Sequence, residues 1–152
     1  MFEQIVSDRR NVNASAEATG ASLDTRFGFK PGQVIQEFGY DEDVDMDFRA
    51  VVEATCGEEI EDEEYNFVAD HALVWWRDDD GDSSDLTDLI TDSMVTLDDG
   101  GDVWVLIPKA GRDGHVPPAE VEEAAATAGM NTTNAIDPGG DWLAFRLTSR
   151  RN

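Results

Sequence analysis

The sequence alternates short apolar runs with longer segments of helical period, and this alternation constrains the fold most strongly. The clearest run is Ala72–Arg77, which is apolar up to its last residue and contains two adjacent tryptophans. Such a run, rich in strand-forming residues, is typical of a strand buried on both faces of a parallel sheet. Because successive strand residues point to opposite faces, we expect Trp75 and Trp76 to pack under different helical layers.

Three segments with apolar residues at helical spacing separate the predicted strands. The first predicted helix stops at Gly57, has Asp45 or Asp47 at its N-terminus, and buries Phe48, Val51, Val52 and Thr55. The second predicted helix buries Leu86, Leu89, Ile90, Ser93, Met94 and Leu97. We expect Ser83 or Ser84 to be its N-cap and the run Asp98–Gly101 to end it.

The third predicted helix lies between Pro118 and Gly129 and turns Val121, Ala124, Ala125 and Ala128 inward. The remaining predicted strands are Gln33–Phe38, Asp102–Pro108, Met130–Ile136 and Trp142–Thr148, the last two joined by a turn at residues 137–140. Ile60 could form a vestigial strand. Strands that alternate with helices and end in a hairpin predict an α/β fold: a three-layer sandwich with a mostly parallel sheet and a C-terminal antiparallel hairpin. We assign residues 1–26 to a flexible tail, with Phe2, Ile5 and Val6 as a short anchor, and residues 27–150 to one domain.

The chain is strongly acidic, with 34 acidic residues against 11 basic ones and a formal net charge of −23. Such a surface repels nucleic-acid phosphates and anionic membranes, so we expect neither as a direct partner. It attracts a protein partner with a basic surface, at a rate that falls with salt. The alternative is that the acidity serves solubility or reflects a salt-adapted or high-GC proteome. The oligomeric state stays open.

The N-terminal residues lack the apolar run of a secretory signal, and no apolar run reaches the roughly 20 residues that cross a bilayer. The one cysteine, Cys56, can form no internal disulfide. These observations predict a cytoplasmic location.

Two resemblances extend this interpretation. The order helix, Leu97–Gly101, strand, helix, Ala128-Gly129, strand, turn, strand resembles the C-terminal half of class I methyltransferases, a Rossmann-like fold, as does Ala69-Asp70 ahead of the buried strand. A closer resemblance covers roughly Phe27 to Arg146 and is carried by Phe27–Gln33, Val74–Asp82 and Val105–His115. On these segments the chain resembles an actinobacterial family of unknown function, number 3052. The resemblance implies a reduced Rossmann-like domain in a bacterial cytoplasm and no assigned activity.

The loop after the first strand is where such folds bind a dinucleotide or S-adenosylmethionine, and it then carries two or three glycines. Here it offers only Gly39, followed by Tyr40 and the carboxylates Asp41, Glu42 and Asp43. Those carboxylates repel a phosphate, although they do not exclude a sulfonium cofactor. We therefore expect no bound cofactor, and a structural remnant of the fold at this loop.

The loop after the buried strand contains Asp78, Asp79, Asp80 and Asp82 around Gly81. Clustered carboxylates suit calcium or magnesium, and Asp78, Asp80 and Asp82 are weak metal candidates. The spacing does not match an EF-hand loop. A solvated loop that caps the next helix is the competing interpretation, and we favour it.

The loop from Lys109 to His115 also follows a predicted strand and holds Arg112, Asp113 and His115. Arg112 could bind a carboxylate with two hydrogen bonds, and His115 titrates near neutrality, so this loop is a candidate for ligand or partner binding. The alternative is an internal clamp in which its cations neutralise Asp78–Asp82. We favour the clamp slightly.

Two tryptophans, the cysteine and one histidine each have a functional and a structural interpretation. An exposed Trp76 or Trp104 would be an anchor for a protein partner. Cys56 and His71 are interpreted as structural residues, because no matching catalytic partner lies near either in sequence.

Three functions remain open on the sequence. The preferred hypothesis is a non-catalytic acidic binding or regulatory protein that acts through a protein partner. The first alternative is a divergent S-adenosylmethionine-dependent methyltransferase, or another small-ligand-binding Rossmann domain, using loops 40–43 and 78–82. The second alternative is a nucleic-acid mimic, which requires acidic residues arranged in rows like phosphates.

Overall fold

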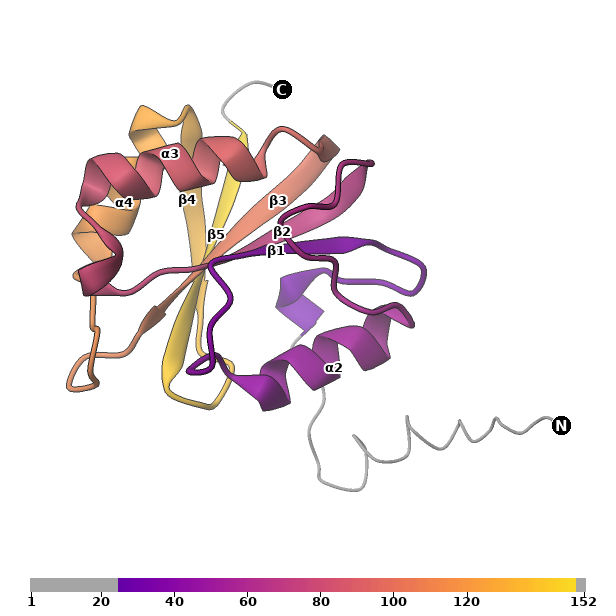
Figure 1. Cartoon of the computed structure of the whole chain (residues 1–152), viewed down its shortest axis with the longest axis horizontal. Helices are drawn as coiled ribbons and strands as arrows, with labels where there is room; N and C mark the ends of the chain where they lie inside the picture. The colour runs from indigo at the N-terminus through magenta and orange to yellow at the C-terminus, as the bar shows by residue number, and fades with distance from the viewer. Residues whose placement is uncertain (1–24, 150–152) are drawn as a thin grey trace, which may run out of the picture.

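A computed structural model of the chain describes residues 25–149 and shows an α/β fold with one five-stranded sheet (Figure 1). The strands are β1 (Ile35–Phe38), β2 (Ala69–Trp75), β3 (Leu97–Pro108), β4 (Met130–Ile136) and β5 (Trp142–Ser149), in the spatial order β1-β2-β3-β5-β4. The first three are parallel to one another. β5 runs antiparallel to both β3 and β4, so the predicted hairpin closes one edge of the sheet.

The helices form a layer on each face of the sheet, as the sequence predicts (Figure 1). α2 (Met46–Cys56) covers one face, whereas α3 (Ser83–Ser93) and α4 (Pro118–Thr127) lie side by side on the other. Two short 3-10 turns, η1 (Thr25–Phe27) and η2 (Asp78–Asp80), complete the described elements. This is the predicted three-layer sandwich, and the parallel strands aim their carboxyl ends at one edge, where open α/β sheets bind ligands.

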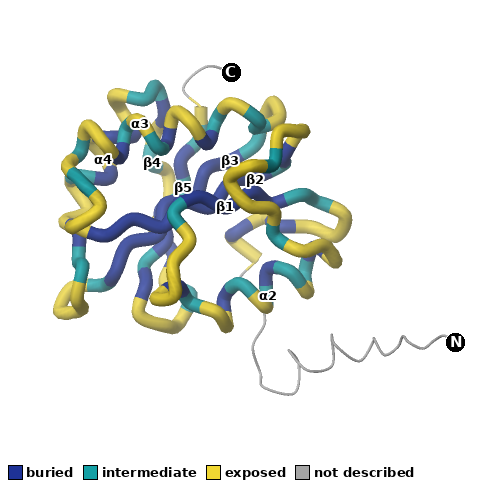
Figure 2. Tube along the Cα trace, viewed as in Figure 1, coloured by how far each residue is buried: buried dark blue, intermediate teal, exposed yellow. Residues whose placement is uncertain are grey.

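The two sheet faces bury separate apolar cores, which appear as the dark strands at the centre of Figure 2. Trp76 belongs to the core under α3 and α4, together with Leu86, Ile90, Val121 and Ala124. Trp75 belongs to the core under α2, together with Phe27, Phe48, Val52 and Trp104. The adjacent tryptophans therefore point to opposite faces, which confirms the prediction made from strand geometry.

The ends of α2 follow the sequence prediction. Asp45 is the N-cap and accepts a hydrogen bond from the Phe48 amide at 2.9 Å. Gly57 ends the helix in the left-handed conformation, with φ 75°. A carboxylate at the first turn and a glycine after the last are the usual solutions for unpaired backbone groups at helix ends.

Two predictions around α3 are wrong. The N-cap is Asp82, not Ser83 or Ser84, because Asp82 accepts from two amides while Asp85 accepts in return from the Asp82 amide. The helix ends at Ser93, so Leu97 and the run Asp98–Gly101 belong to β3. There, residues 98–101 bulge opposite the single residue Asp70.

The vestigial strand predicted at Ile60 appears one residue later. Glu61 forms a parallel bridge with Gln36 on the outer edge of β1, and Ile60 packs against the α2-side core. The chain then returns across β1 to enter β2. No helix among residues 25–149 is both long and apolar enough to cross a membrane. The predicted tail, residues 1–26 with its anchor, lies almost entirely outside the described residues.

Candidate functional site

The order in which strands are added to the sheet reverses at β1. From β1 the chain passes through α2 to the Glu61 bridge on the outer edge, and then crosses back to β2 on the other side. Open α/β sheets bind ligands outside the carboxyl ends of the strands at such a reversal. The candidate site of this protein is therefore the space between the end of β1 at Phe38 and the end of β2 at Trp75.

The backbone leaves β1 at a glycine because the two strand ends approach very closely. Gly39 has φ 76°, and a β-carbon there would lie 2.4 Å from the carbonyl oxygen of Trp75. Its amide donates to Glu63 Oε2 at 2.7 Å. Gly39 thus allows the end of β1 to lie close against β2. In a cofactor-binding loop, by contrast, the glycines leave room for a ligand.

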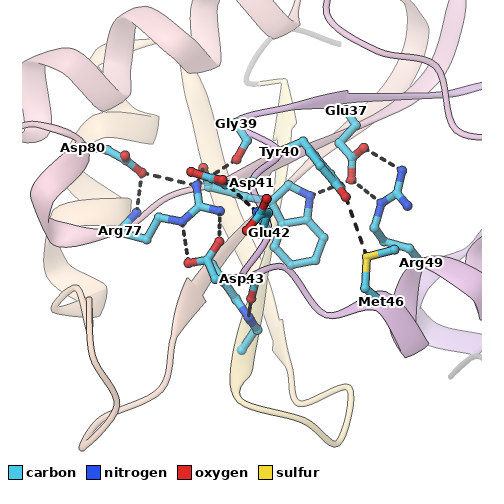
Figure 3. A network of polar contacts seen from close by, with 12 residues as sticks. Glu37, Gly39, Tyr40, Asp41, Glu42, Asp43, Met46, Arg49, Arg77 and Asp80 are labelled. Atoms are coloured by element: carbon cyan, nitrogen blue, oxygen red, sulfur yellow. Dashed lines mark hydrogen bonds and ion pairs between the residues drawn. The ribbon is translucent and has the colours of Figure 1, made fainter.

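Arg77 lies across the site, immediately after β2 (Figure 3). Its Nε and Nη2 donate to the two oxygens of Asp43, at 3.0 and 2.5 Å, and its Nη1 donates to the Gly39 carbonyl at 2.7 Å. Asp80 adds a weaker contact at 3.4 Å. The guanidinium also lies over the Trp142 ring, 5.2 Å from its centroid. Arg77 therefore ties the loop after β1, the loop after β2 and the start of β5 together.

This arrangement fixes the charge of the groups involved. The Arg77 hydrogen bond holds the pKa of the Asp43 carboxyl below its usual value, and partial burial opposes this effect. Arg77 is only 8% exposed, and a two-hydrogen-bond contact with a carboxylate is the pairing that a guanidinium satisfies best. A permanently paired Asp43 is a poor general base.

A second ion pair closes the α2 side of the same site (Figure 3). Glu37 is buried at the end of β1 and accepts two hydrogen bonds from Arg49 of α2, at 2.7 and 2.8 Å. The Trp75 indole donates to the same carboxylate at 2.8 Å. Arg49 also lies 5.0 Å from the centroid of the half-exposed Tyr40 ring. Both carboxylate oxygens of Glu37 are thus paired within the protein.

The acidic loop 78–82 is a structural turn. Asp80 accepts from the Arg77 amide, and Asp82 caps α3. Asp78 and Asp79 belong to the same 3-10 turn, and the Asp78 amide donates to the Gly114 carbonyl at 3.0 Å. Between residues 25 and 149, no three His, Cys, Asp or Glu side chains gather in a way that could hold a metal ion.

The Lys109–His115 loop does act as an internal clamp, but with other partners than the sequence predicts. Lys109 pairs with Asp137 at 2.7 Å and Arg112 with Asp141 at 3.1 Å, both in the β4–β5 turn. The prediction that these cations neutralise Asp78–Asp82 is wrong, because both pair with aspartates of the β4–β5 turn instead. His115 bonds the Pro108 carbonyl at 2.8 Å through Nδ1, and Asp113 is exposed.

Neither tryptophan proposed as a partner anchor is available. Trp76 is 5% exposed and Trp104 is fully buried, so each is a core residue. Cys56 is buried as well, and burial raises the pKa of its thiol to about 11. A nucleophilic role for Cys56 is thereby disfavoured.

His71 belongs to a buried polar cluster on the α2 face. Its Nε2 lies 3.2 Å from Gln33 Oε1, and its Nδ1 lies 4.0 Å from Asp102, which accepts from Arg146 at 2.8 Å. Burial lowers the pKa of His71. The cluster links β2, β3 and β5 away from the strand ends.

Sequence reasoning missed Arg77 as the central residue of the site. One signal existed: Arg77 is a lone cation at the end of a buried strand and is followed by three aspartates. Its main partner, however, lies 34 positions earlier in the sequence. Only the sheet topology brings Asp43 and Arg77 together.

The sequence profile of a family described as "Protein of unknown function (DUF3052)" matches residues 24–151. This chain belongs to the DUF3052 family. The uncharacterized proteins Rv2239c of Mycobacterium tuberculosis and Mb2263c of Mycobacterium bovis are each 45% identical to it over 127 residues. Each match covers 84% of this chain and 78% of the relative. The family thus occurs in mycobacteria.

Solved structures with a similar fold include a methyltransferase. The mitomycin 7-O-methyltransferase MmcR matches 90% of this chain with a TM-score of 0.59 and 12% identity, and the pyocyanin biosynthetic protein PhzM matches 95% with a TM-score of 0.56 and 11% identity. The DUF3052 chain spans 53% of MmcR and 59% of PhzM. At this identity the likeness establishes the Rossmann-like fold of class I methyltransferases and nothing about activity.

Proposed function

We propose that this protein is a non-catalytic binding protein that acts through a protein partner with a basic surface. The observation that carries the proposal is Arg77, which bridges the strand ends at the point where this fold otherwise binds ligands. The guanidinium donates to both Asp43 and the Gly39 carbonyl, so these polar groups are paired within the protein.

The N-terminus of α2 supports the same conclusion. A free helix N-terminus attracts the phosphate of a nucleotide because its amides are unpaired and its dipole end is positive. Here Asp45 caps the Phe48 amide, and Asp41, Glu42 and Asp43 precede it. An anionic cofactor would meet four carboxylates at this position.

The net charge of −23 supports a basic protein as the partner. Like-charge repulsion disfavours phosphate polymers, whereas attraction to a positive surface raises the association rate at low salt. The charge also opposes self-association. A cytoplasmic location agrees with this function and stays a prediction.

A divergent methyltransferase is the second candidate, and the fold shared with MmcR and PhzM favours it. It requires S-adenosylmethionine to bind near Gly39, which in turn requires Arg77 to leave the site. Calorimetric titration separates the two candidates. Binding tighter than about 100 μM, near −5.5 kcal/mol, would favour the methyltransferase.

The partner itself is sought by capture from the protein's own cell lysate. The tagged full chain is incubated at roughly 0.1 M and at roughly 0.5 M salt, between which the screening length falls from about 10 Å to a few ångströms. We expect one basic protein at near stoichiometric yield, weakened at the higher salt. Recovery of no specific protein at either salt contradicts the proposal.

A further inference from the structure

An open groove lies on the α3 side of the sheet, beside the edge strand β1. Its volume is about 360 Å³, and it lies between residues 63–66, which precede β2, and the C-terminal part of α3 with the turn after it. Phe38 of β1 and Leu89 of α3 contribute apolar lining. The groove adjoins the Arg77 site at Phe38 and Glu63, but Arg77 and Asp43 are not part of its lining.

The walls of the groove are held in place by one buried glutamine. Gln36, which is 1% exposed, donates from Nε2 to the carbonyls of Asp62 and Tyr65, at 3.1 and 2.9 Å. Its Oε1 accepts from the Thr96 hydroxyl on the opposite wall. The Ala69 amide adds a hydrogen bond to the Thr96 carbonyl at 2.9 Å. The groove is therefore preformed, and an occupant meets little cost of ordering it.

Exposed apolar side chains occur both in the lining of the groove and in residues 67–68, which lead from it into β2. Val95 lines the groove and is 79% exposed. Phe67 is 72% exposed, and its ring lies 5.7 Å from that of Tyr65, which lines the groove. Val68, 62% exposed, accepts at its carbonyl from the Tyr65 hydroxyl. Exposed large apolar residues grouped in this way mark interaction surfaces.

The charged residues of the lining are all acidic: Glu63, Glu64 and Asp92. Glu63 holds the Gly39 amide, but Glu64 and Asp92 are exposed. Asp92 lies in the last turn of α3, where the helix dipole does not stabilise a carboxylate. This carboxylate is therefore open to a cation from outside the chain.

We propose that this groove binds an amphipathic helix of the partner protein, with apolar side chains seated on Phe38, Leu89 and Val95 and with lysines or arginines facing Glu64 and Asp92. The apolar lining favours a helix with an apolar face, and the carboxylates favour basic residues on the flanks of that helix. This inference rests on the proposed function and names the surface by which it acts.

The test is fluorescence anisotropy with the full chain and a labelled peptide of about 15 residues, long enough to form a helix. The probe has leucines on one helical face and lysines on the other. A scrambled peptide of the same composition has no apolar face. We expect the scrambled peptide to bind at least about tenfold more weakly, since about 1.4 kcal/mol of apolar contact corresponds to that factor.

Two double variants locate the binding. Phe67→Ser with Val95→Ser removes apolar contacts, and Glu64→Lys with Asp92→Lys reverses the charge of the groove. Each double variant is expected to bind the probe about tenfold more weakly or worse. All four positions are exposed, so folding is preserved. Glu122→Lys with Glu123→Lys makes the same change of charge on α4 and is expected to weaken the probe less than about threefold.

Three results with the peptide probe would overturn the groove as the binding site. They are equal affinity for both peptides, equal loss of affinity in the groove and α4 charge variants, and a tenfold gain of affinity when Ile5→Ser and Val6→Ser are introduced. The last would make the chain's own N-terminal segment the occupant. If groove variants still capture a basic partner from lysate, the groove fails and the proposed function stands. If S-adenosylmethionine binds the chain while the groove variants still lose affinity for the probe, the groove stands as a binding surface and the proposed function fails.

Discussion

The pairing of Arg77 with Asp43 gives the sharpest energetic prediction. Arg77→Met keeps an unbranched apolar stem but removes contacts to Asp43, Gly39 and Asp80. Asp43→Asn leaves the guanidinium buried with neutral acceptors and Asp80. Hydrogen bonds to charged groups contribute about 1.5–3 kcal/mol each, whereas exposed ion pairs contribute about 0–1 kcal/mol.

The side chains are 10% exposed for Arg77 and 54% for Asp43, so the pair lies between these limits. We expect each single variant to lower the free energy of unfolding by about 2–3 kcal/mol, and the double-mutant cycle to yield a coupling energy of about 1–2 kcal/mol. The assay is urea unfolding followed by tryptophan fluorescence, since Trp142 lies under the guanidinium.

The matched control is the exposed pair Lys109–Asp137, at a distance of 2.7 Å. Its side chains are 27% and 58% exposed, and its coupling energy is expected to be below about 0.5 kcal/mol. If the Arg77–Asp43 coupling is no larger than that of the control, Arg77 does not hold the strand ends together, and the reasoning about the closed site is refuted.

Three further predictions follow from local geometry. Cys56, with its pKa raised to about 11 by burial, should react with a thiol reagent at neutral pH only as fast as the protein unfolds; rapid labelling of folded protein would contradict this. Burial lowers the pKa of His71, so the unfolded chain binds that proton more readily, and stability should fall as the pH drops below about 6.5; a His71→Gln variant should lose this part of the pH dependence. Gly39→Ala places a β-carbon 2.4 Å from the Trp75 carbonyl and should lower the free energy of unfolding by over about 2 kcal/mol. Gly57→Ala has a similar φ of 75° but open space around it, and should lower the free energy of unfolding by about 1 kcal/mol. Equal losses of stability in the two variants would contradict the close approach at Gly39.

The elements that sequence reasoning found are those whose signals are local. The apolar period of α2, the cap at Asp45 and the left-handed Gly57 depend on neighbouring residues only. The C-terminal hairpin is equally local, because its two strands flank one short turn. These elements fixed the α/β fold and its layers.

The failures share one cause, which is pairing between distant segments. Leu97 fits the period of α3, yet it pairs with Ala69, and Gly101 allows a β3 bulge close to the Asp70 carbonyl. The partners of Lys109 depend on which turn lies beside the Lys109–His115 loop. Side-chain burial likewise depends on tertiary contacts, which is why the sequence leaves Trp104 open as a partner anchor although this residue is fully buried.

Loops 40–43 and 78–82, which the methyltransferase hypothesis uses, are joined by Arg77 through its contacts to Asp43 and Asp80. Nothing local in the sequence indicates that Arg77 lies between them, and whether these loops bind a ligand stays a prediction. A groove made by Gln36, Tyr65 and Thr96 has no sequence signature either, since its walls come from three separate segments.

Whether Arg77 closes the ligand position of this fold is decided by an NMR titration of the ¹⁵N-labelled full chain with S-adenosylmethionine up to roughly 1 mM. The amides of Gly39 and Tyr40 and the Arg77 Nε–H are the reporters. We expect no saturable shift of these signals, and an Arg77 Nε–H that stays hydrogen-bonded to Asp43. Saturable shifts at Gly39 and Arg77, with a dissociation constant below about 100 μM, near −5.5 kcal/mol, would contradict this closure and make the protein a cofactor-binding methyltransferase relative.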